Sequence, residues 1–211
     1  KCTVAESVSL PSTLTKMSDT KVAKYGTFRE CTSLKTVTMP ANLEMIGPYC
    51  FLDCTALTTV ILNDDLTTVT YGMGMTETGN MAFRNASVSK INFSSTITEI
   101  SPWGFFGCNF VKLEIPETVT KINIRGFANC TALQEVTVHN PNCVFDGIGQ
   151  ADASGGKDPF NGSQQSLVVK GHSNSTAQAY AKAKGYKFVS IDACDHASTH
   201  EVITLEPTCT Q

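Results

Sequence analysis

Cys31-Thr-Ser-Leu-Lys-Thr-Val-Thr-Met-Pro40 is the stretch of sequence that decides the fold, because the chain repeats it. It returns as Cys54-Thr-Ala-Leu-Thr-Thr-Val60 and as Cys130-Thr-Ala-Leu-Gln-Glu-Val136. Basic units run 22 or 23 residues, a period that indicates a protein built of stacked repeats. Variants of the same start stand at Cys2, Ala86 and Cys108.

Each unit continues with apolar residues at fixed spacing and closes with a phenylalanine three residues before the next Cys, Ala or Ser. The first apolar position is held by Leu14, Leu43, Leu66, Ile97, Val119 and Val144. The second, three residues later, is held by Met17, Ile46, Val69, Ile100 and Ile122. The closing residues are Phe28, Phe51, Phe83, Phe105, Phe127 and Phe160.

This pattern predicts a leucine-rich-repeat solenoid of the α/β repeat class, made mostly of short parallel strands and turns. An alternation such as Val37-x-Met39 before Pro40 is typical of a short strand that points every second side chain inward. One unit cannot bury its apolar face alone, so the units stack and like residues form columns.

The full pattern Cys-Thr-x-Leu-x-x-Val-x-Met-Pro-x-x-Leu-x-x-Ile-Gly-x-x-x-Phe resembles the BspA-type, or Treponema-type, leucine-rich repeat. The resemblance covers Cys2 to Gly162, with departures at Asn63 and at Asn140-Pro141. It implies a bacterial cell-surface or secreted protein used for adhesion or protein binding, and similar repeats occur in protozoan surface proteins. The family offers no catalytic residues to transfer.

The chain is expected to divide into three parts. Residues 1–162 form six repeats, with inserts at 18–27, 70–82 and 148–159 that fall in the same slot and therefore along one edge. Residues 163–191 form a C-terminal strand-helix-strand cap with a helix at about 175–184, between a Ser/Asn/Thr capping signal and Gly185. Residues 192–211 form a tail, interpreted as the start of a following module, so the chain is expected to be a fragment whose signal and anchor lie elsewhere.

The nine cysteines are mostly explained by the repeat. Cys behaves as a small buried apolar residue, and Ala86 and Ser163 take its place in two units. We therefore expect reduced, buried thiols at Cys2, Cys31, Cys50, Cys54, Cys108 and Cys130.

The tail holds four residues of the types that bind zinc, with three interpretations left open: structural zinc, a Cys194–Cys209 disulfide, or an unstructured tail. They are Cys194, His196, His200 and Cys209. No other cofactor is expected.

Two sets of residues are candidates for binding a partner. The repeat-three insert offers Tyr71, Met73 and Met75, although methionines more often fold back to fill gaps. The outward positions of the strands offer a polar face that suits hydrogen bonding to a protein or glycan, or is merely solvated. These outward residues include Thr36, Thr38, Thr59, Asn92, Lys112, Glu114 and Thr137.

The repeat-six insert holds three carboxylates among glycines, at Asp146, Asp152 and Asp158. Neither the spacing of a calcium loop nor that of a phosphate loop is present, so the sequence favours a flexible acidic loop.

Composition and motifs narrow the function. The net charge of -3 and the lack of Lys/Arg clusters argue against nucleic acid, and no run of apolar residues is long enough to span a membrane. Gly-x-Ser-x-Gly and His-Glu-x-x-His are absent. We expect a monomeric, extracellular, non-enzymatic module that binds an unknown protein or glycan, a host molecule among the candidates. The alternatives are a structural spacer and a glycan-binding module.

Overall fold

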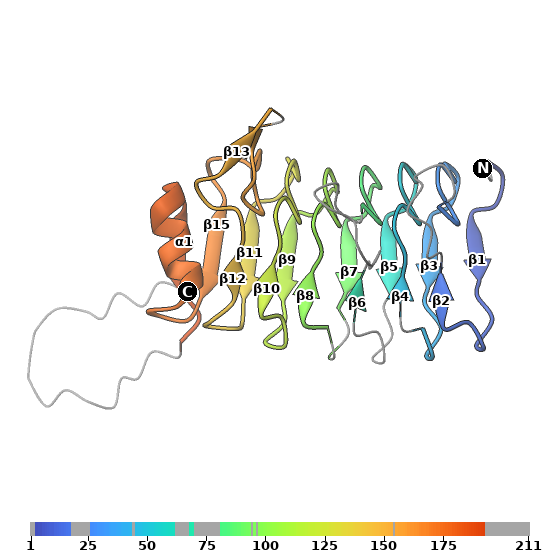
Figure 1. Ribbon diagram of the computed structural model, residues 1–211, viewed down its shortest axis with the longest axis horizontal. Helices are drawn as coiled ribbons and strands as arrows, with labels where there is room; N and C mark the ends of the chain where they lie inside the picture. Colours follow the sequence, from blue (N-terminus) through green and yellow to red (C-terminus); the bar gives the residue numbers. More distant parts are fainter. Residues whose placement is uncertain are drawn as a thin grey trace, which may run out of the picture.

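Figure 1 shows the chain in a computed structural model as an elongated stack of coils running from the N-terminus to a terminal helix. The structure describes residues 3–17, 26–43, 45–61, 68–69, 81–93, 95, 97–153 and 155–192. Every coil contributes one longer strand and one short strand to separate parallel layers. The predicted leucine-rich-repeat solenoid is confirmed.

The longer strands pair in parallel, and residues of the same repeat position face each other, as Val8, Val37 and Val60 do. They form two groups, in the orders β1-β3-β5-β7 and β9-β11-β15-β16. Their bounds are β1 Ser7–Ser9, β3 Thr36–Thr38, β5 Thr59–Ile61, β7 Lys90–Asn92, β9 Lys112–Ile115, β11 Glu135–Val138, β15 Val168–Gly171 and β16 Lys187–Ser190. We call the outward side of these strands the long-strand face.

The short strands form a second parallel sheet in the order β12-β10-β8-β6-β4-β2, which the sequence pattern did not predict as strand. Its residues are the second apolar position of each unit and the residue before it. The bounds are β2 Lys16–Met17, β4 Met45–Ile46, β6 Thr68–Val69, β8 Glu99–Ile100, β10 Lys121–Ile122 and β12 Val144–Phe145.

The predicted apolar columns are wrong at one described residue. Val144 is 53% exposed, whereas Cys143 and Phe145 on either side of it are buried. Cys143 donates its N–H to Asn140, as Val119 does to Pro116, so Cys143 occupies the first apolar position. Phe145 pairs with Ile122 and occupies the second. This coil is one residue tighter between the two positions, which turns Val144 outward.

The recurring phenylalanines form a continuous stack through the core. Centroids of neighbouring rings lie 5.1 Å apart for Phe51–Phe83 and 5.5 Å apart for Phe127–Phe160, with the planes nearly parallel. From Phe51 onward the stacked rings are fully buried. Offset stacking of this kind adds about 0.5–1.5 kcal/mol per pair beyond burial of the ring surface.

Each phenylalanine sits in a turn, here called the Phe turn, that runs from two residues before the ring to two residues after it. The ring's own N–H donates to the next coil, as Phe83 does to the carbonyl of Gly104 at 2.9 Å. The last residue of the turn adopts the left-handed conformation in all six turns, and the first residue does so in the turns of Phe51, Phe83, Phe105 and Phe127. Residues that carry a side chain rarely adopt this conformation. The left-handed residues are Tyr49, Met81, Trp103 and Arg125 before the ring, and Glu30, Asp53, Asn85, Gly107, Asn129 and Gly162 after it.

The prediction of buried free thiols is confirmed for the cysteines that the structure describes: Cys31, Cys50, Cys54, Cys108 and Cys130. Cys143 is a further buried free thiol. Cys2 lies outside the described residues. The thiol of Cys108 donates to the carbonyl of Phe83 at 3.2 Å, and that of Cys130 to the carbonyl of Phe105 at 3.3 Å. Burial raises the pKa of the Cys54 and Cys130 thiols to about 12, so both stay protonated as donors.

The C-terminal end is covered by β15, helix α1 (Thr176–Lys184) and β16, where the sequence predicts a strand-helix-strand unit. Ser175 caps the helix by accepting from the N–H of Gln178, and Gly185 ends it in the left-handed conformation. Tyr180 stacks on Phe145 at 4.5 Å between ring centroids. Its hydroxyl donates to Asp158 at 2.9 Å, which ties the helix to the last Phe turn.

Candidate functional site

The outward side chains of the long-strand face change character along the stack. At the N-terminal end they are small and neutral, as at Thr36, Thr38 and Thr59. From β7 onward they carry charge, and most are exposed: Lys90, Lys112, Glu114, Glu135 and Lys170. The predicted binding residues are therefore divided between the two halves, although Thr59 of the neutral half faces Lys90 of the charged half directly.

The face is interrupted between β7 and β9, because no hydrogen bond joins these two strands in the part of the chain that the structure describes. A hollow of about 290 Å³ lies at this break. Phe93, which stands at an inward repeat position, is only partly buried here and meets Phe105 edge-on at 5.9 Å. The hollow is lined by Ile91, Asn92, Phe93, Glu114, Pro116 and His139.

A fixed polar network forms one wall of the hollow. Glu114 accepts a hydrogen bond from the hydroxyl of Thr137 at 3.0 Å and pairs with Nε2 of His139 at 2.8 Å. The side chains of Glu114 and His139 are 65% and 44% exposed, so the pair faces solvent. Asn92 lies on the opposite strand of the same hollow. The structure thus brings together the predicted residues Asn92, Glu114 and Thr137.

Thr137 is a correction to the predicted surface, because it is only 5% exposed. It lies in the outward row between Glu114 of β9 and Lys170 of β15. The longer side chains on both sides cover the short hydroxyl side chain. Thr137 orients Glu114 and is not itself a contact surface.

A second, more polar hollow of about 460 Å³ adjoins Lys112 on the same face. Glu135 is part of its lining and pairs with Lys170 at 3.0 Å and with Lys112 at 3.8 Å. Gln134 and Gln164 complete the polar lining. The side chains of Glu135 and Lys170 are only 21% and 33% exposed, so this ion pair is half-buried.

The repeat-six insert is an ordered hairpin, and the expectation of a flexible acidic loop is wrong. Strands β13 (Ala151–Asp152) and β14 (Gly155–Gly156) pair in antiparallel fashion and project from the edge of the stack that carries the Phe turns (Figure 1). Buried Arg125 holds the hairpin by donating to both carboxylate oxygens of Asp152, at 2.6 and 3.1 Å, and to the carbonyls of Gly155 and Gly156.

Each carboxylate of this region faces a cation of the chain itself. Asp146 pairs with Lys121 at 3.2 Å, Asp152 with Arg125, and Asp158 with Lys184 at 2.9 Å. The three carboxylates therefore point to different partners instead of converging. Within the described residues, no group of three or more His, Cys, Asp or Glu side chains is placed to hold a metal ion.

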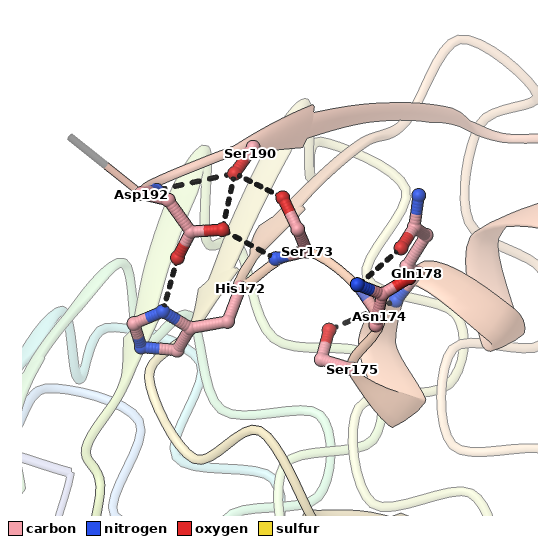
Figure 2. Close-up of polar contacts among 7 residues, drawn as sticks. All are labelled: His172, Ser173, Asn174, Ser175, Gln178, Ser190 and Asp192. Carbon is pink, nitrogen blue, oxygen red and sulfur yellow. Dashed lines mark hydrogen bonds and ion pairs between the residues drawn. The ribbon is translucent and has the colours of Figure 1, made fainter. Parts of the chain in front are cut away.

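A polar network joins the cap strands where β16 ends (Figure 2). Asp192 accepts from Nδ1 of His172 at 2.6 Å and from the N–H of Ser173 at 2.8 Å. The hydroxyls of Ser173 and Ser190 bond to each other at 3.0 Å, and that of Ser190 also donates to Asp192. Hydrogen bonds from Ser173, then His172 and Ser190, hold the pKa of the Asp192 carboxyl well below its usual range.

This His–Asp pair resembles part of a hydrolase triad, but its geometry serves the cap. A triad needs a nucleophile on the second imidazole nitrogen, and both hydroxyls lie on the carboxylate side of the pair instead. The network fastens the segment after β15 to the segment after β16.

Several predicted site residues lie outside the described part of the chain: Tyr71, Met73 and Met75 of the repeat-three insert, and Cys194, His196, His200 and Cys209 of the tail. Sequence reasoning also missed residues that the structure singles out, namely Phe93, His139, Arg84, Trp103 and Arg125. The available signal for Trp103 and Arg125 was their shared position two residues before a recurring phenylalanine.

No helix in the described part of the chain is both long and apolar enough to cross a membrane. None of the curated proteins matches the sequence. Among solved structures, the pneumococcal vaccine antigen PcpA is similar, with a TM-score of 0.53 at 13% identity over 75% of this chain and 42% of that one.

Two further structures are similar at a lower score. A leucine-rich-repeat protein of Bacteroides ovatus gives a TM-score of 0.43 at 16% identity, over 68% of this chain and 41% of that one. A leucine-rich cell-surface protein of Faecalibacterium prausnitzii gives 0.43 at 17%, over 79% and 44%. The chain thus spans less than half the length of each of these structures. The model of the BspA-type leucine-rich-repeat region matches residues 1–73 and 63–147, and the chain belongs to this family.

Proposed function

We propose that the chain is a non-enzymatic binding module of a bacterial cell-surface or secreted protein, and that it holds a protein partner on the charged half of the long-strand face. The observation that carries this proposal is the hollow between β7 and β9. Its base is apolar, from Ile91, Phe93 and Pro116, and its rim is polar. An apolar pocket within a polar rim is the arrangement in which interface anchor residues bind.

The size of the hollow favours a protein over a free small molecule. At about 290 Å³ it falls at the lower limit of small-molecule sites, and it fits one large side chain. A protein partner would insert one anchor residue there and would contact Glu114 and His139 at the rim. Because Thr137 already holds Glu114 in place, binding would cost little side-chain entropy.

The surface location belongs to the same proposal. The family resemblance implies it, and the similar structure PcpA is a vaccine antigen, which is compatible with it. A glycan partner is less well supported, because the only tryptophan, Trp103, lies in a Phe turn and not on the long-strand face.

The test is a binding screen of the intact chain against extracellular-matrix proteins, bacterial and host surface proteins, and a glycan array. The hit is then measured with Asn92→Arg and Glu114→Lys, which block and reverse the rim of the hollow. Each variant is expected to weaken binding by about tenfold or more.

Matched variants at the neutral end of the same face, Thr36→Arg and Thr38→Lys, are expected to bind like the intact chain. Equal loss in both pairs, or loss only in the threonine variants, would contradict the proposed position of the site. A hit on the glycan array alone would contradict the proposed class of partner.

A further inference from the structure

A cluster of two arginines and two aromatic rings lies on the edge formed by the Phe turns, away from the long-strand face. The guanidinium of Arg84 lies 5.3 Å from the ring centroid of Trp103 and 5.1 Å from that of Phe106. The two rings contact each other at 4.9 Å. Arg125 lies 4.6 Å from the same indole. Trp103 thus has a guanidinium from each neighbouring coil beside its ring.

The two arginines differ in the acceptors of their hydrogen bonds. Arg125 is buried and donates to the Asp152 carboxylate and to two carbonyls of the hairpin. Arg84 is only partly buried, and its hydrogen bond is to the thioether sulfur of Met81 at 3.4 Å, a weak acceptor. Within the described ranges, no carboxylate pairs with Arg84.

Among the described residues, no carboxylate compensates the charge of Arg84. Asp152 faces both Arg125 and Lys157, the latter at 3.9 Å, so one carboxylate already serves two cations. Nε of Arg84 and Nε1 of Trp103 are also buried without a hydrogen-bond partner. Buried donors of this kind are rare in folded proteins, which indicates that the cluster is incomplete as it stands.

From this contrast we infer that Arg84, Trp103 and Phe106 form a second docking site, for an acidic loop of a protein partner. The hairpin held by Arg125 is an example of what an arginine binds at this edge. Arg125 donates hydrogen bonds to an aspartate carboxylate and to main-chain carbonyls of the same tight turn. Arg84 offers the same planar fork beside the same indole, and no carboxylate from the described part of the chain occupies it. The rings of Trp103 and Phe106 supply apolar contact beside the charge, and Trp and Arg are the residues most enriched at interface anchor positions.

Binding at this site can be followed by tryptophan fluorescence, because Trp103 is the only tryptophan of the chain. The probe is a cyclic peptide with the sequence Gly-Ala-Asp-Ala-Gly-Gly, which copies the chemistry of the hairpin, and its control is the same peptide with Asn in place of Asp. We expect the Asp peptide to change Trp103 fluorescence with a dissociation constant in the millimolar range, and the Asn peptide to bind about tenfold more weakly.

The decisive variant is Arg84→Ala, matched by Arg29→Ala. Arg29 also follows the phenylalanine of its turn, but it pairs with Glu30 at 2.8 Å. Arg84→Ala is expected to lose the response to the Asp peptide about tenfold, and Arg29→Ala is expected to keep it. Arg84→Lys keeps the charge but loses the planar fork, and its response to the Asp peptide is expected to lie between those of the two alanine variants. It keeps the proposal testable if the alanine variant does not fold.

Three results would overturn the inference: no fluorescence response to the Asp peptide at millimolar concentration, an equal response to the Asn peptide, or an unchanged response in Arg84→Ala. Sodium sulfate is titrated in parallel. A response to sulfate as large as that to the Asp peptide would identify a general anion site and would also overturn the assignment to a protein loop.

Discussion

The two ends of the stack differ in how completely they bury the same repeat positions. In the first coil Val8, Leu14 and Phe28 are only partly buried, although their equivalents one coil later are fully buried. At the other end Phe160 is fully buried, and Tyr180 of helix α1 lies beside its ring at 6.0 Å between centroids. The difference shows that burial in this molecule depends on having a neighbour on both sides, and not on the side chain itself.

Polar groups of the molecule also differ in whether another group of the chain already binds them. At the C-terminal end, Asp146, Asp152 and Asp158 are each paired with a cation of the chain, and Asp192 is held by His172 and two serines. The long-strand face keeps polar groups that are exposed, and the Arg84 cluster keeps buried donors without a hydrogen-bond partner among the described residues. Binding is therefore proposed where the stack leaves polar groups unpaired or exposed.

The largest effect is expected from removing a stacked ring, which tests whether burial depends on a neighbour on both sides. Phe105 lies between Phe83 and Phe127 and also meets Phe93 and Phe110 edge-on, so Phe105→Ala is expected to cost about 3–5 kcal/mol of unfolding free energy. Phe28 stacks on one ring only, and Phe28→Ala is expected to cost about half as much. Urea unfolding followed by circular dichroism measures both, and equal losses would refute the dependence on two neighbours.

An intermediate effect is expected from the attachment of the cap. Tyr180→Phe removes the hydroxyl that donates to Asp158, a buried carboxylate, and is expected to cost about 1–3 kcal/mol. Burial is the main cause that raises the pKa of Tyr180, so the phenol stays protonated as a donor at neutral pH. Hydrogen exchange is expected to accelerate in β15, α1 and β16 and to stay unchanged in β3 and β5.

The control for the cap is Tyr186→Phe, because the Tyr186 hydroxyl makes no hydrogen bond to any described residue. It is expected to leave exchange in the cap unchanged. Unchanged exchange in Tyr180→Phe, which keeps the ring, would show that ring packing and not the bond to Asp158 attaches the helix. A similar acceleration by both variants would show that the effect is not specific to that bond.

The smallest effect concerns the exposed network at the end of β16. The pKa of Asp192 is lowered in the folded state from its ordinary value of 3.8, so its contribution to stability is present above that value and is lost as the pH falls through the folded pKa. Asp192→Asn is therefore expected to flatten the dependence of thermal stability on pH below about pH 5. Glu117→Gln, which alters a carboxylate without a side-chain partner among the described residues, serves as the control and is expected to leave that dependence unchanged.

The repeat columns could be predicted because stacking forces like residues into register, and the phenylalanine spacing located the six rings of the continuous stack from Phe28 to Phe160. Val144 was misplaced because its coil is one residue tighter, a change that only the pairing of Phe145 with Ile122 reveals. The hairpin was missed because its order comes from Arg125, which is distant in sequence and carries no motif.

The candidate sites were only partly predictable for the same reason. The outward rows of strand residues follow from alternation, which placed Asn92 and Glu114 on the long-strand face; that they bind a partner stays a prediction. The hollow itself depends on β7 and β9 failing to pair, and the Arg84 cluster depends on contacts between neighbouring Phe turns. Contacts across coils of this kind leave no spacing signal within one coil.

The slot that holds the inserts has a consequence for how such arrays diversify. It lies between a short strand that pairs with its neighbours and a Phe turn that is hydrogen-bonded to the next coil, so both of its ends are anchored independently. Loop length in this slot is uncoupled from the register of the stack, as the hairpin at residues 148–159 demonstrates. New surface can therefore be acquired or exchanged one coil at a time by selection or by grafting, while the scaffold beneath it keeps its geometry.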